Sequence, residues 1–450
     1  MKRWFSGWVA GVLCMVGAQA GIPIEHWTQA NGAQVFLVQS PGLPMVDVQI
    51  DFDAGARRDP AGRAGLASAT ALMIGKGLKA RGAMPALDEN AVGEAWADGG
   101  ALFSASASSD RMSFTLRSLT RTEVLDASMR LAARHLADPA FSADIWARER
   151  ERWSASLRES LTKPGTVADR AWTPAVFGTH PYGQQTTPES LLALSVADMQ
   201  AFHARHIAPC RAKVSVVGAL NRAQVQAWVT ELLAALPSGA SGASGASGAS
   251  CAALPAVPEV QPLTQAKEIF IPFESAQAHV SMGQPGYKRD DPDFFALTVG
   301  NYVLGGGGFV SRLTEQVREK RGLSYSVYSY FSPGLHAGPF AIGLQTRPDQ
   351  ARQAVEVVRA VLKDFVEKGP TQAELQAAKD NLTGGFALRL DSNRKLLDNL
   401  ANIAWHQLPL DYLDTWTQKV QALTVQDVSQ AFVRKVQPER QVTVVVGGTP

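Results

Sequence analysis

The chain has 450 residues, of which 46% are hydrophobic, and it carries 43 basic and 41 acidic residues. This length and composition are sufficient for two sizeable hydrophobic cores. A charge balance so close to neutral gives no argument for binding to nucleic acid or to an anionic membrane. Three cysteines are too few for a fold held together by disulfides.

Residues 1–20 have the three parts of a secretory signal peptide. Lys2 and Arg3 form a basic start, an apolar run follows, and the sequence AQA at 18–20 matches an A-x-A cleavage site. The apolar run is shorter than the ~20 residues that a membrane span needs. We therefore predict export to a bacterial periplasm through a cleaved signal peptide, with no stable membrane insertion.

Strand and helix patterns alternate irregularly through the rest of the chain. Apolar and polar residues alternate, or β-branched and aromatic residues gather, in the predicted strands near 46–52, 112–116, 278–284, 324–331 and 338–346. Helical spacing predicts helices near 64–76, 86–98, 121–137, 142–162, 291–303, 348–367 and 371–387. Strands flanked by helices, without regular βαβ alternation, favour an α+β fold.

The sequence SGASGASGASGAS at 238–250 is a low-complexity repeat with almost nothing to bury, which predicts a flexible linker. We expect the segments on its two sides to be separately compact units. The predicted segments are a signal peptide at 1–20, an N-terminal half at 21–237, a linker at 238–260 and a C-terminal half at 261–450. Cys210 and Cys251 remain after removal of the signal, and the sequence leaves open whether they form a disulfide.

The two halves resemble each other at their ends. Residues 194–218 align without gaps on residues 423–447, and nine of 25 positions are identical, including Asp198 with Asp427. This similarity indicates that both halves are copies of one α/β unit.

His203, His206 and Cys210 have a spacing that would suit a metal cluster. In the alignment of the halves, however, His203 corresponds to Phe432 and Cys210 to Glu439, so the second half does not repeat the same metal-binding residue at either position. We therefore interpret these positions as structural.

The stretch 304–331 has the most distinctive order of residues. It opens with four consecutive glycines, Gly305, Gly306, Gly307 and Gly308, which permit unusual backbone conformations and a close approach to the main chain. A predicted helix follows with Arg318 in its last turn, and a strand begins near Tyr325. No Gly-Lys-Ser/Thr follows the glycines, so a nucleotide-binding P-loop is excluded.

This order resembles the C-terminal half of the pitrilysin/insulinase family of zinc metallopeptidases, which includes relatives of the mitochondrial processing peptidase. In the family, an arginine at the helix end and a tyrosine seven residues later reach the zinc site of the other half and support the scissile peptide. Arg318 and Tyr325 have that spacing, and the resemblance implies that they are catalytic supports and that the four glycines and this pair bind substrate. It also implies two halves facing each other like a clamshell. Alternatively, Arg318 is a helix-end cation and Tyr325 a half-buried strand aromatic.

The zinc motif of the family, H-x-x-E-H, is missing. The family's lead-in places Ser68, Ala71 and Leu72 where the two histidines and the glutamate would stand, and these side chains cannot bind or activate a zinc-bound water. The family's third ligand is a glutamate some 75 to 80 residues later. Without histidines to join, the acidic residues in that region are expected to be solvated helix charges: Glu149, Glu151 and Glu159.

These features together imply a non-catalytic subunit. The resemblance implies that the chain binds peptide and supplies Arg318 and Tyr325 in trans to a homologous partner chain that carries H-x-x-E-H. Zinc is expected in that partner and no cofactor in this chain, which would be active only within a heteromeric peptidase. The alternative is a catalytically inactive pseudopeptidase that binds peptides or acts as a scaffold.

Overall fold

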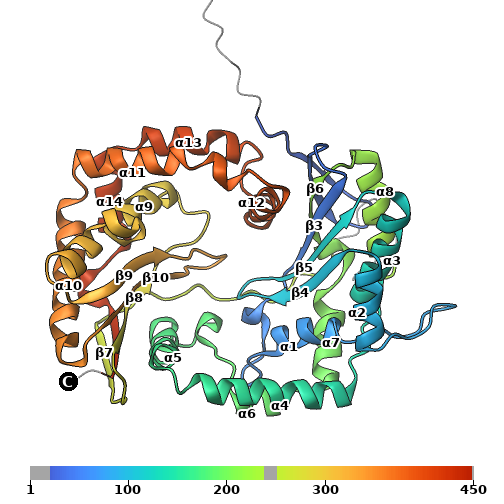
Figure 1. The fold of residues 1–450 in the computed structure, drawn as a ribbon, viewed down its shortest axis with the longest axis horizontal. Helices are drawn as coiled ribbons and strands as arrows, with labels where there is room; N and C mark the ends of the chain where they lie inside the picture. The colour runs from blue at the N-terminus through green and yellow to red at the C-terminus, as the bar shows by residue number, and fades with distance from the viewer. Residues whose placement is uncertain (1–20, 238–250, 448–450) are drawn as a thin grey trace, which may run out of the picture.

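The computed structural model describes residues 21–237 and 251–447. The predicted signal peptide at 1–20 and the Ser-Gly-Ala repeat at 238–250 lie outside the described residues. The fold is α+β, with two mixed β-sheets flanked by helices, as predicted (Figure 1).

The first sheet has six strands in the order β1-β2-β6-β3-β5-β4. Its strands are β1 (Glu25–Thr28), β2 (Gln34–Gln39), β3 (Met45–Phe52), β4 (Leu102–Ala107), β5 (Met112–Leu119) and β6 (Lys213–Gly218). Strands β2 and β6 are parallel, and the other neighbours are antiparallel. Strand β4 lies at the edge of the sheet.

The second sheet has five strands in the order β7-β11-β8-β10-β9. Its strands are β7 (Lys267–Ile271), β8 (Ala278–Pro285), β9 (Ser324–Phe331), β10 (Pro339–Thr346) and β11 (Val442–Val446). Only β7 and β11 are parallel. Its order therefore corresponds strand for strand to β2-β6-β3-β5-β4 of the first sheet.

Fourteen α-helices flank the sheets in the described part of the chain. Those before the linker are α1 (Leu66–Ile74), α2 (Glu89–Asp98), α3 (Thr122–Ala137), α4 (Ala143–Ser160), α5 (Pro164–Phe177), α6 (Pro188–Leu192), α7 (Val196–His206) and α8 (Arg222–Leu233). Those after it are α9 (Phe294–Asn301), α10 (Ala351–Lys368), α11 (Gln372–Gly384), α12 (Asn393–His406), α13 (Tyr412–Ala422) and α14 (Val425–Lys435). The seven predicted helices are present as α1 to α4 and α9 to α11.

The repeated sequence at 194–218 and 423–447 has a local physical explanation. Helices α7 and α14 begin with the same capping box, in which Ser195 or Thr424 exchanges hydrogen bonds with the aspartate three residues later. Those aspartates are Asp198 and Asp427, which satisfy backbone N–H groups that a helix start leaves without partners. The identical aspartates therefore fix the same helix start in both halves.

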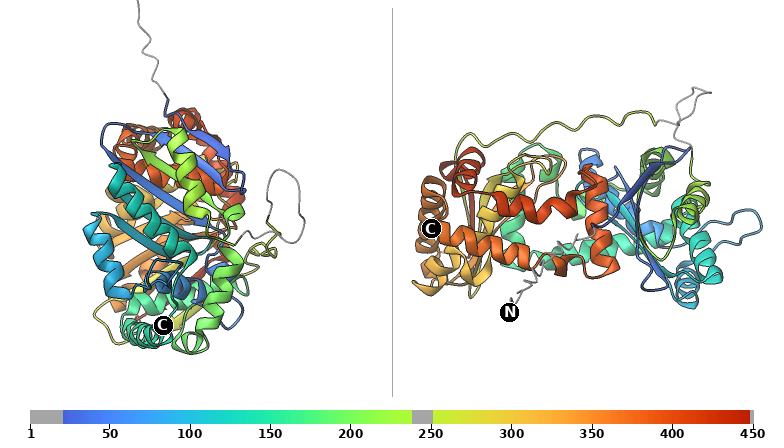
Figure 2. Two further views of the ribbon diagram at one scale, coloured as in Figure 1. Left: turned by 90° about the vertical axis from the view of Figure 1, so that its right-hand side faces the viewer. Right: turned by 90° about the horizontal axis from the view of Figure 1, so that it is seen from above.

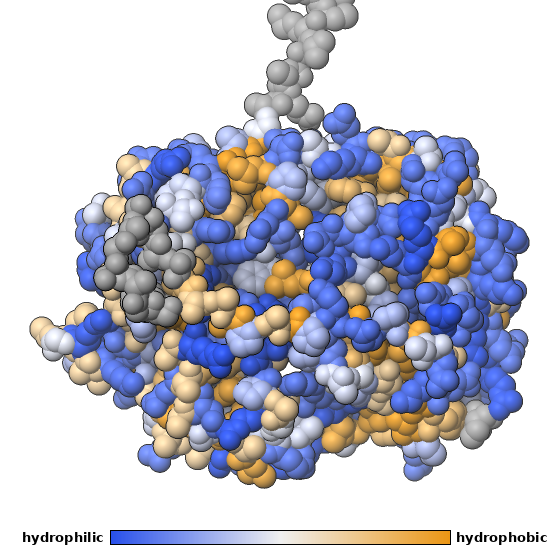
Figure 3. Space-filling model, turned by 180° about the vertical axis from the view of Figure 1, so that it is seen from behind, coloured by the Kyte–Doolittle hydropathy of each residue, from blue (hydrophilic) through white to orange (hydrophobic). Residues whose placement is uncertain are grey.

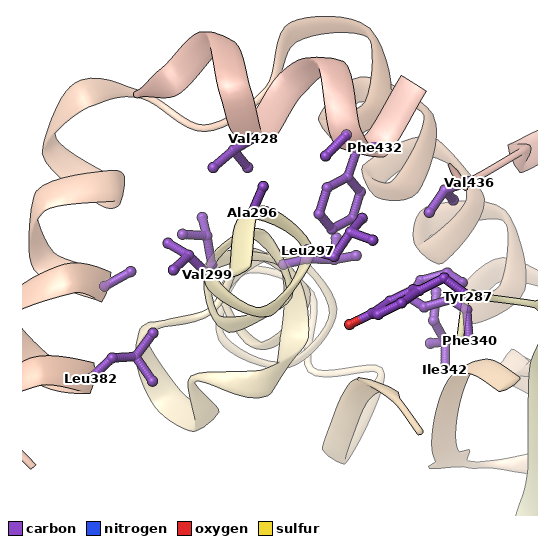
Figure 4. Close-up of a cluster of buried hydrophobic side chains, with 14 of the residues drawn as sticks. Tyr287, Ala296, Leu297, Val299, Phe340, Ile342, Leu382, Val428, Phe432 and Val436 are labelled. Carbon is purple, nitrogen blue, oxygen red and sulfur yellow. The ribbon is translucent and has the colours of Figure 1, made fainter. Parts of the chain in front are cut away.

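Each sheet is covered on one face by helices of its own half. In the C-terminal core, Leu297 of α9 lies beside Phe432 of α14, and Val299, Val428 and Phe340 belong to the same cluster (Figure 4). These five side chains are almost fully buried, and burial of each contributes roughly 1.5–3 kcal/mol to stability.

Helix α5 belongs to the N-terminal half by sequence but packs on strands β8 and β11 of the C-terminal sheet (Figure 1). Trp172 is buried there among Val442, Val444 and Val446, and its indole N–H donates to the Val442 carbonyl at 3.3 Å. A Cβ on Gly283 would lie 2.7 Å from the Trp172 ring, so only glycine lets the indole approach the sheet this closely.

Helix α12 makes the reverse crossing and packs on β6 and β3 of the N-terminal sheet (Figure 1). The Lys213 ammonium of β6 donates to the Ala404 and Trp405 carbonyls, both at 3.0 Å, and so satisfies the end of α12. Each sheet therefore takes one of its covering helices from the other half. This exchange of helices does not favour the expectation of separately compact halves.

The exit of the linker contacts both halves. Cys251 forms a disulfide with Cys210, and the Arg211 guanidinium donates to the Ala252 carbonyl at 2.7 Å. Further along, Glu259 accepts from Lys288 at 3.1 Å, on the C-terminal side. The segment runs from one half to the other without regular secondary structure (Figure 2).

The surface is mixed in character. On the face seen in Figure 3, hydrophilic residues predominate and apolar residues occur in smaller groups between them. Within 21–237 and 251–447, no helix has both the length and the apolar character that crossing a bilayer would require.

Candidate functional site

The four glycines do not form an open loop. Helix α9 continues into a π-helical turn, Tyr302–Gly306, and the main chain then turns into a short 3₁₀ segment. A Cβ on Gly305 would lie 2.6 Å from the Ser329 backbone nitrogen of β9, and one on Gly307 would lie 2.6 Å from the Tyr302 carbonyl oxygen.

Gly306 and Gly308 complete this account of the glycine run. A Cβ on Gly306 would lie 2.6 Å from the Asn301 amide nitrogen, whereas Gly308 has open space around it. Gly308 instead has a φ of 61°, which glycine adopts without a steric penalty. Close internal packing therefore explains why three of these positions are glycine, and the backbone conformation explains the fourth. Gly306 and Gly308 are exposed at the surface.

The helix that positions Arg318 is short and partly π-helical, at Thr314–Glu319. Leu313 and Val317, four residues apart, are fully buried, whereas Val310, three residues before Leu313, is 73% exposed. Gly322, at a φ of 61°, ends the helix, and its N–H donates to the Arg318 carbonyl at 2.8 Å. Strand β9 then begins and carries Tyr325 away from the helix end.

Arg318 and Tyr325 lie together at the surface. The Arg318 guanidinium carbon is 4.6 Å from the centroid of the Tyr325 ring and 4.8 Å from that of Phe309. Such distances are typical of cation–π contacts. Tyr325 is 80% exposed, which does not agree with the alternative of a half-buried strand aromatic. Sequence reasoning missed Phe309, although an aromatic beside the glycines was the available signal.

The polar ends of this pair have no hydrogen-bonding or ion-pair partner within 21–237 and 251–447. Among the described residues, no hydrogen bond or ion pair engages the Arg318 guanidinium or the Tyr325 hydroxyl. The pair therefore presents a cation and a hydroxyl donor to whatever contacts this surface.

Strand β9 continues the surface with two further tyrosines. Tyr328 and Tyr330 stack with ring centroids 6.1 Å apart, and both are partly exposed. Partial burial raises the pKa of each hydroxyl, so both are neutral donors at physiological pH. Because β9 is the last strand of its sheet, one side of its backbone has no neighbouring strand.

The degenerate zinc positions lie on α1. Ser68 and Leu72 are half-buried one turn apart, and Ala71 is buried. Within the described ranges, no three His, Cys, Asp or Glu side chains come close enough to hold a metal ion. The residues at this position therefore do not fit a catalytic zinc.

Glu149 of α4 is not the solvated charge that the sequence suggested, because it is only 1% exposed. It pairs with Lys76 at 3.4 Å and Arg148 at 3.0 Å, and also with Arg152. Burial by itself would raise the pKa of this carboxyl, but the neighbouring cations outweigh it and hold the pKa below its usual value. Glu151 and Glu159, in contrast, are exposed as expected.

Lys76 was missed by sequence reasoning. It follows Leu72 by four residues, so it continues the same face just beyond the end of α1. Its ammonium also pairs with Glu89 of α2. A cation thus neutralises the buried glutamate without any metal ligand on α1.

The histidines that could have suggested a metal cluster have structural hydrogen bonds. His203 lies 2.8 Å from the Leu136 carbonyl through Nε2, and His206 lies 2.9 Å from the Asp53 carbonyl through Nδ1. Burial lowers the pKa of both rings, so they are neutral and donate N–H to these carbonyls. Cys210 is held in the disulfide.

Comparison with known proteins places these features in a family. Residues 193–382 match the family described as "Peptidase M16 inactive domain". A crystal structure of a peptidase M16 inactive domain from Pseudomonas fluorescens is 32% identical, covers 95% of this chain and 98% of that chain, and superposes with a TM-score of 0.87.

Two curated proteins extend the comparison. The chain is 25% identical over 438 residues to "Non-peptidase homolog YmxG" of Helicobacter pylori, covering 95% of this chain and 94% of the relative. It is also 29% identical over 290 residues to an uncharacterized zinc protease of Streptomyces coelicolor, where the match covers 63% of this chain and 61% of the relative.

The near-complete coverage of the Pseudomonas structure, at more than 30% identity, decides the assignment. The chain belongs to the M16, or pitrilysin, family of peptidases, and it resembles the members of that family that are described as inactive.

Proposed function

We propose that this chain is the non-catalytic subunit of a periplasmic zinc metallopeptidase and supplies Arg318 and Tyr325 in trans to a partner chain that carries H-x-x-E-H. The observation that carries the proposal is the arrangement of this pair. The guanidinium lies 4.6 Å from the tyrosine ring centroid, and Tyr325 is 80% exposed. Both polar ends are without a partner among the described residues.

The chemistry of the pair suits transition-state support. Preorganised donors aimed at the oxygen where negative charge develops stabilise the tetrahedral intermediate of peptide hydrolysis. Arg318 offers a fixed cation and Tyr325 a neutral hydroxyl donor. A zinc ion in the partner would supply the activated water, which this chain, with Ser68, Ala71 and Leu72, does not provide.

The substrate would be a peptide lying along the exposed surface of β9. The Ser329 carbonyl of that strand already accepts from Asn301 at 3.1 Å, so hydrogen bonds to an extended chain would come from the β9 backbone nearer Tyr325. Tyr328 and Tyr330 would contact its side chains, and the exposed Gly306 and Gly308 leave room beside Arg318.

Two further features support the location and architecture within this proposal. The Cys210–Cys251 disulfide suits an oxidising compartment such as the periplasm, to which the predicted signal peptide would direct the chain. The matching strand orders suit two copies of one unit in a clamshell arrangement, with the linker joining them at 238–260.

The test is reconstitution with a zinc-bearing homologous chain, identified by co-purification from the native cell. Mixing the two should create peptidase activity that neither has alone. Arg318→Ala or Tyr325→Phe should lower turnover by about 10²- to 10³-fold, the usual loss for one oxyanion donor. The matched control is Arg321→Ala, because Arg321 is exposed and donates to Gln316 instead.

The second candidate is a pseudopeptidase that binds peptides or acts as a scaffold, and the name of the Helicobacter relative favours it. In that case Tyr325→Phe complexes would turn over at the wild-type rate, while loss of Arg318 would weaken assembly. Turnover and complex formation measured on the same samples separate the two candidates.

A further inference from the structure

A second recess, distinct from the Arg318–Tyr325 surface, is lined by residues of α9, the end of β9 and the α12–α13 pair. Its volume is about 470 Å³, which is within the range of small-molecule sites in proteins. Phe294, Phe331, Phe386 and Trp416 contribute aromatic walls. An apolar group of the size of an aromatic side chain fits such a cavity.

Two guanidinium groups line the same recess. Arg289 donates to the Tyr412 hydroxyl at 2.6 Å, and its guanidinium carbon lies 3.6 Å from the Phe294 ring centroid. The guanidinium carbon of Arg389 lies 5.6 Å from the Trp416 ring centroid. Both arginines therefore face α13, where Tyr412 and Trp416 are one turn apart.

These two cations are not neutralised. No aspartate or glutamate lines the recess, and in the described part of the chain neither arginine has a carboxylate within ion-pair distance. Arg289 is half-buried and Arg389 is exposed, whereas the half-buried Arg312 pairs with Glu374 at 2.7 Å. A positive, aromatic-walled cavity without an internal counter-ion favours an anionic ligand.

Nearby positive charge influences the pKa values of two groups in the recess, Tyr412 and His406. Burial raises the pKa of the Tyr412 hydroxyl, and the guanidiniums of Arg289 and Arg389 both oppose that rise. Burial, assisted by Arg289 and Arg111 and opposed by Asp110, lowers the pKa of His406 to about 4. His406 is therefore a neutral hydrogen-bonding group at the wall of the recess.

We propose that this recess binds an organic carboxylate with an apolar or aromatic body, with the carboxylate held by Arg289 and Arg389 and the body against the aromatic walls. The planar guanidinium group can donate two parallel N–H···O hydrogen bonds to the two oxygens of a carboxylate, as it also can to a phosphate. Two sources share this chemistry: the C-terminal residue of a peptide and a free aromatic acid. The inference does not rest on the proposed trans-acting role of Arg318 and Tyr325.

The experiment is calorimetric titration of the purified mature chain with N-acetyl-phenylalanine and with N-acetyl-phenylalanine amide. The acid should bind saturably, and the amide at least about tenfold more weakly, since a hydrogen bond to a charged group contributes about 1.5–3 kcal/mol. This comparison uses the unaltered protein and is independent of any folding defect in a variant.

Variants then locate the site. Arg389→Gln should weaken binding of the acid about tenfold or more, and the exposure of Arg389 makes a folding defect unexpected. The control is Arg394→Gln on α12, because Arg394 is exposed, pairs with Asp398 and does not line the recess. Equal melting temperatures of the two variants would show that folding is not the cause.

Two further probes distinguish the sources. A tripeptide ending in phenylalanine should bind more tightly than 3-phenylpropionate if the ligand is a chain end, and equally or more weakly if it is a free acid. The proposal is overturned if none of the acids binds saturably below about 10 mM, if the amide binds as well as the acid, or if Arg394→Gln weakens binding as much as Arg389→Gln.

Discussion

Buried ionisable side chains link the stability of this protein to pH, and His135 on α3 shows the link most directly. The side chain is 1% exposed and stacks on Phe103 of β4. The indole N–H of Trp96 donates to its Nε2 at 3.1 Å, so the ring proton sits on Nδ1, which donates to the Ile74 carbonyl at 3.0 Å. A second proton on Nε2 would face the indole N–H.

The first consequence is a loss of stability in acid. Burial lowers the pKa of His135 from 6.5 to about 4, so below pH 6.5 the unfolded chain takes up a proton that the folded chain does not. The free energy of unfolding should therefore fall as pH falls from 6.5 to 4, by up to about 3 kcal/mol from this residue. Denaturant unfolding at several pH values measures it.

A matched pair of variants isolates the residue. His135→Gln, which cannot titrate, should flatten part of this pH dependence, with the rest retained by other buried histidines such as His206. His26→Gln, at an exposed position on β1, should change the slope much less. An unchanged slope in His135→Gln would show that the ring is charged or solvated in the folded state.

At the scale of elements, we infer that α1 and α4 are placed as the zinc site of the family would require, although the ligands on α1 are missing. Ser68 and Leu72 lie one turn apart on α1, and Glu149 of α4 follows Leu72 at the spacing that the family resemblance implies for a third ligand. Lys76 pairs with that glutamate instead. The loss of zinc binding would then result from changed side chains on α1, with the positions of the two helices retained.

The corresponding prediction is that zinc binding can be installed. The unaltered chain should hold no stoichiometric zinc, whereas Ser68→His, Ala71→Glu and Leu72→His together should bind one zinc per chain, measured by metal analysis after gel filtration. Adding Glu149→Gln should weaken binding by more than about tenfold. Adding Lys76→Gln should strengthen it, because the ammonium competes with zinc for the carboxylate. A triple variant without zinc, with or without Lys76→Gln, would show that α1 and α4 are not placed as a zinc site requires.

At the scale of the whole molecule, the exchange of α5 and α12 makes the two halves one folding unit. Both helices bury apolar faces on a sheet that the other half supplies. Separating the halves would expose these faces to water, which costs free energy in proportion to the apolar area. The linker is therefore not what holds the halves together.

This leads to a prediction about a nicked chain. With a specific protease site placed in 238–250, cleavage followed by reduction of the Cys210–Cys251 disulfide should leave the halves co-eluting in gel filtration. Trp172→Ala should weaken their association, since truncation of a buried tryptophan typically costs about 3–5 kcal/mol. Trp153→Ala is the control, because Trp153 is on the same half but packs, partly buried, against the N-terminal core. Two separate compact fragments in the nicked, reduced wild type would contradict the shared core.

The sequence by itself was sufficient for much of the fold and for the family. Strand alternation at 46–52 and helical spacing at 348–367 are local properties, and both elements are present as β3 and α10. The order of the glycines, Arg318 and Tyr325 was enough to indicate the family, and the identities of Ser68, Ala71 and Leu72 were enough to exclude the zinc motif. These inferences need only residue types and spacing along the chain.

The tertiary structure decided what depends on partners far apart in the sequence. Periodicity shows which face of a helix is apolar but not which sheet covers it, so the crossing of α5 and α12 could not be foreseen. The sequence identifies Glu149 as a charged residue but does not show that it is buried. Its contacts with Lys76, Arg148 and Arg152 explain how the buried charge is compensated. Likewise, packing against Ser329 explains Gly305, and the spatial meeting of Cys210 with Cys251 decides the disulfide. Burial and pairing are properties of three-dimensional neighbours, which the order of residues does not specify locally.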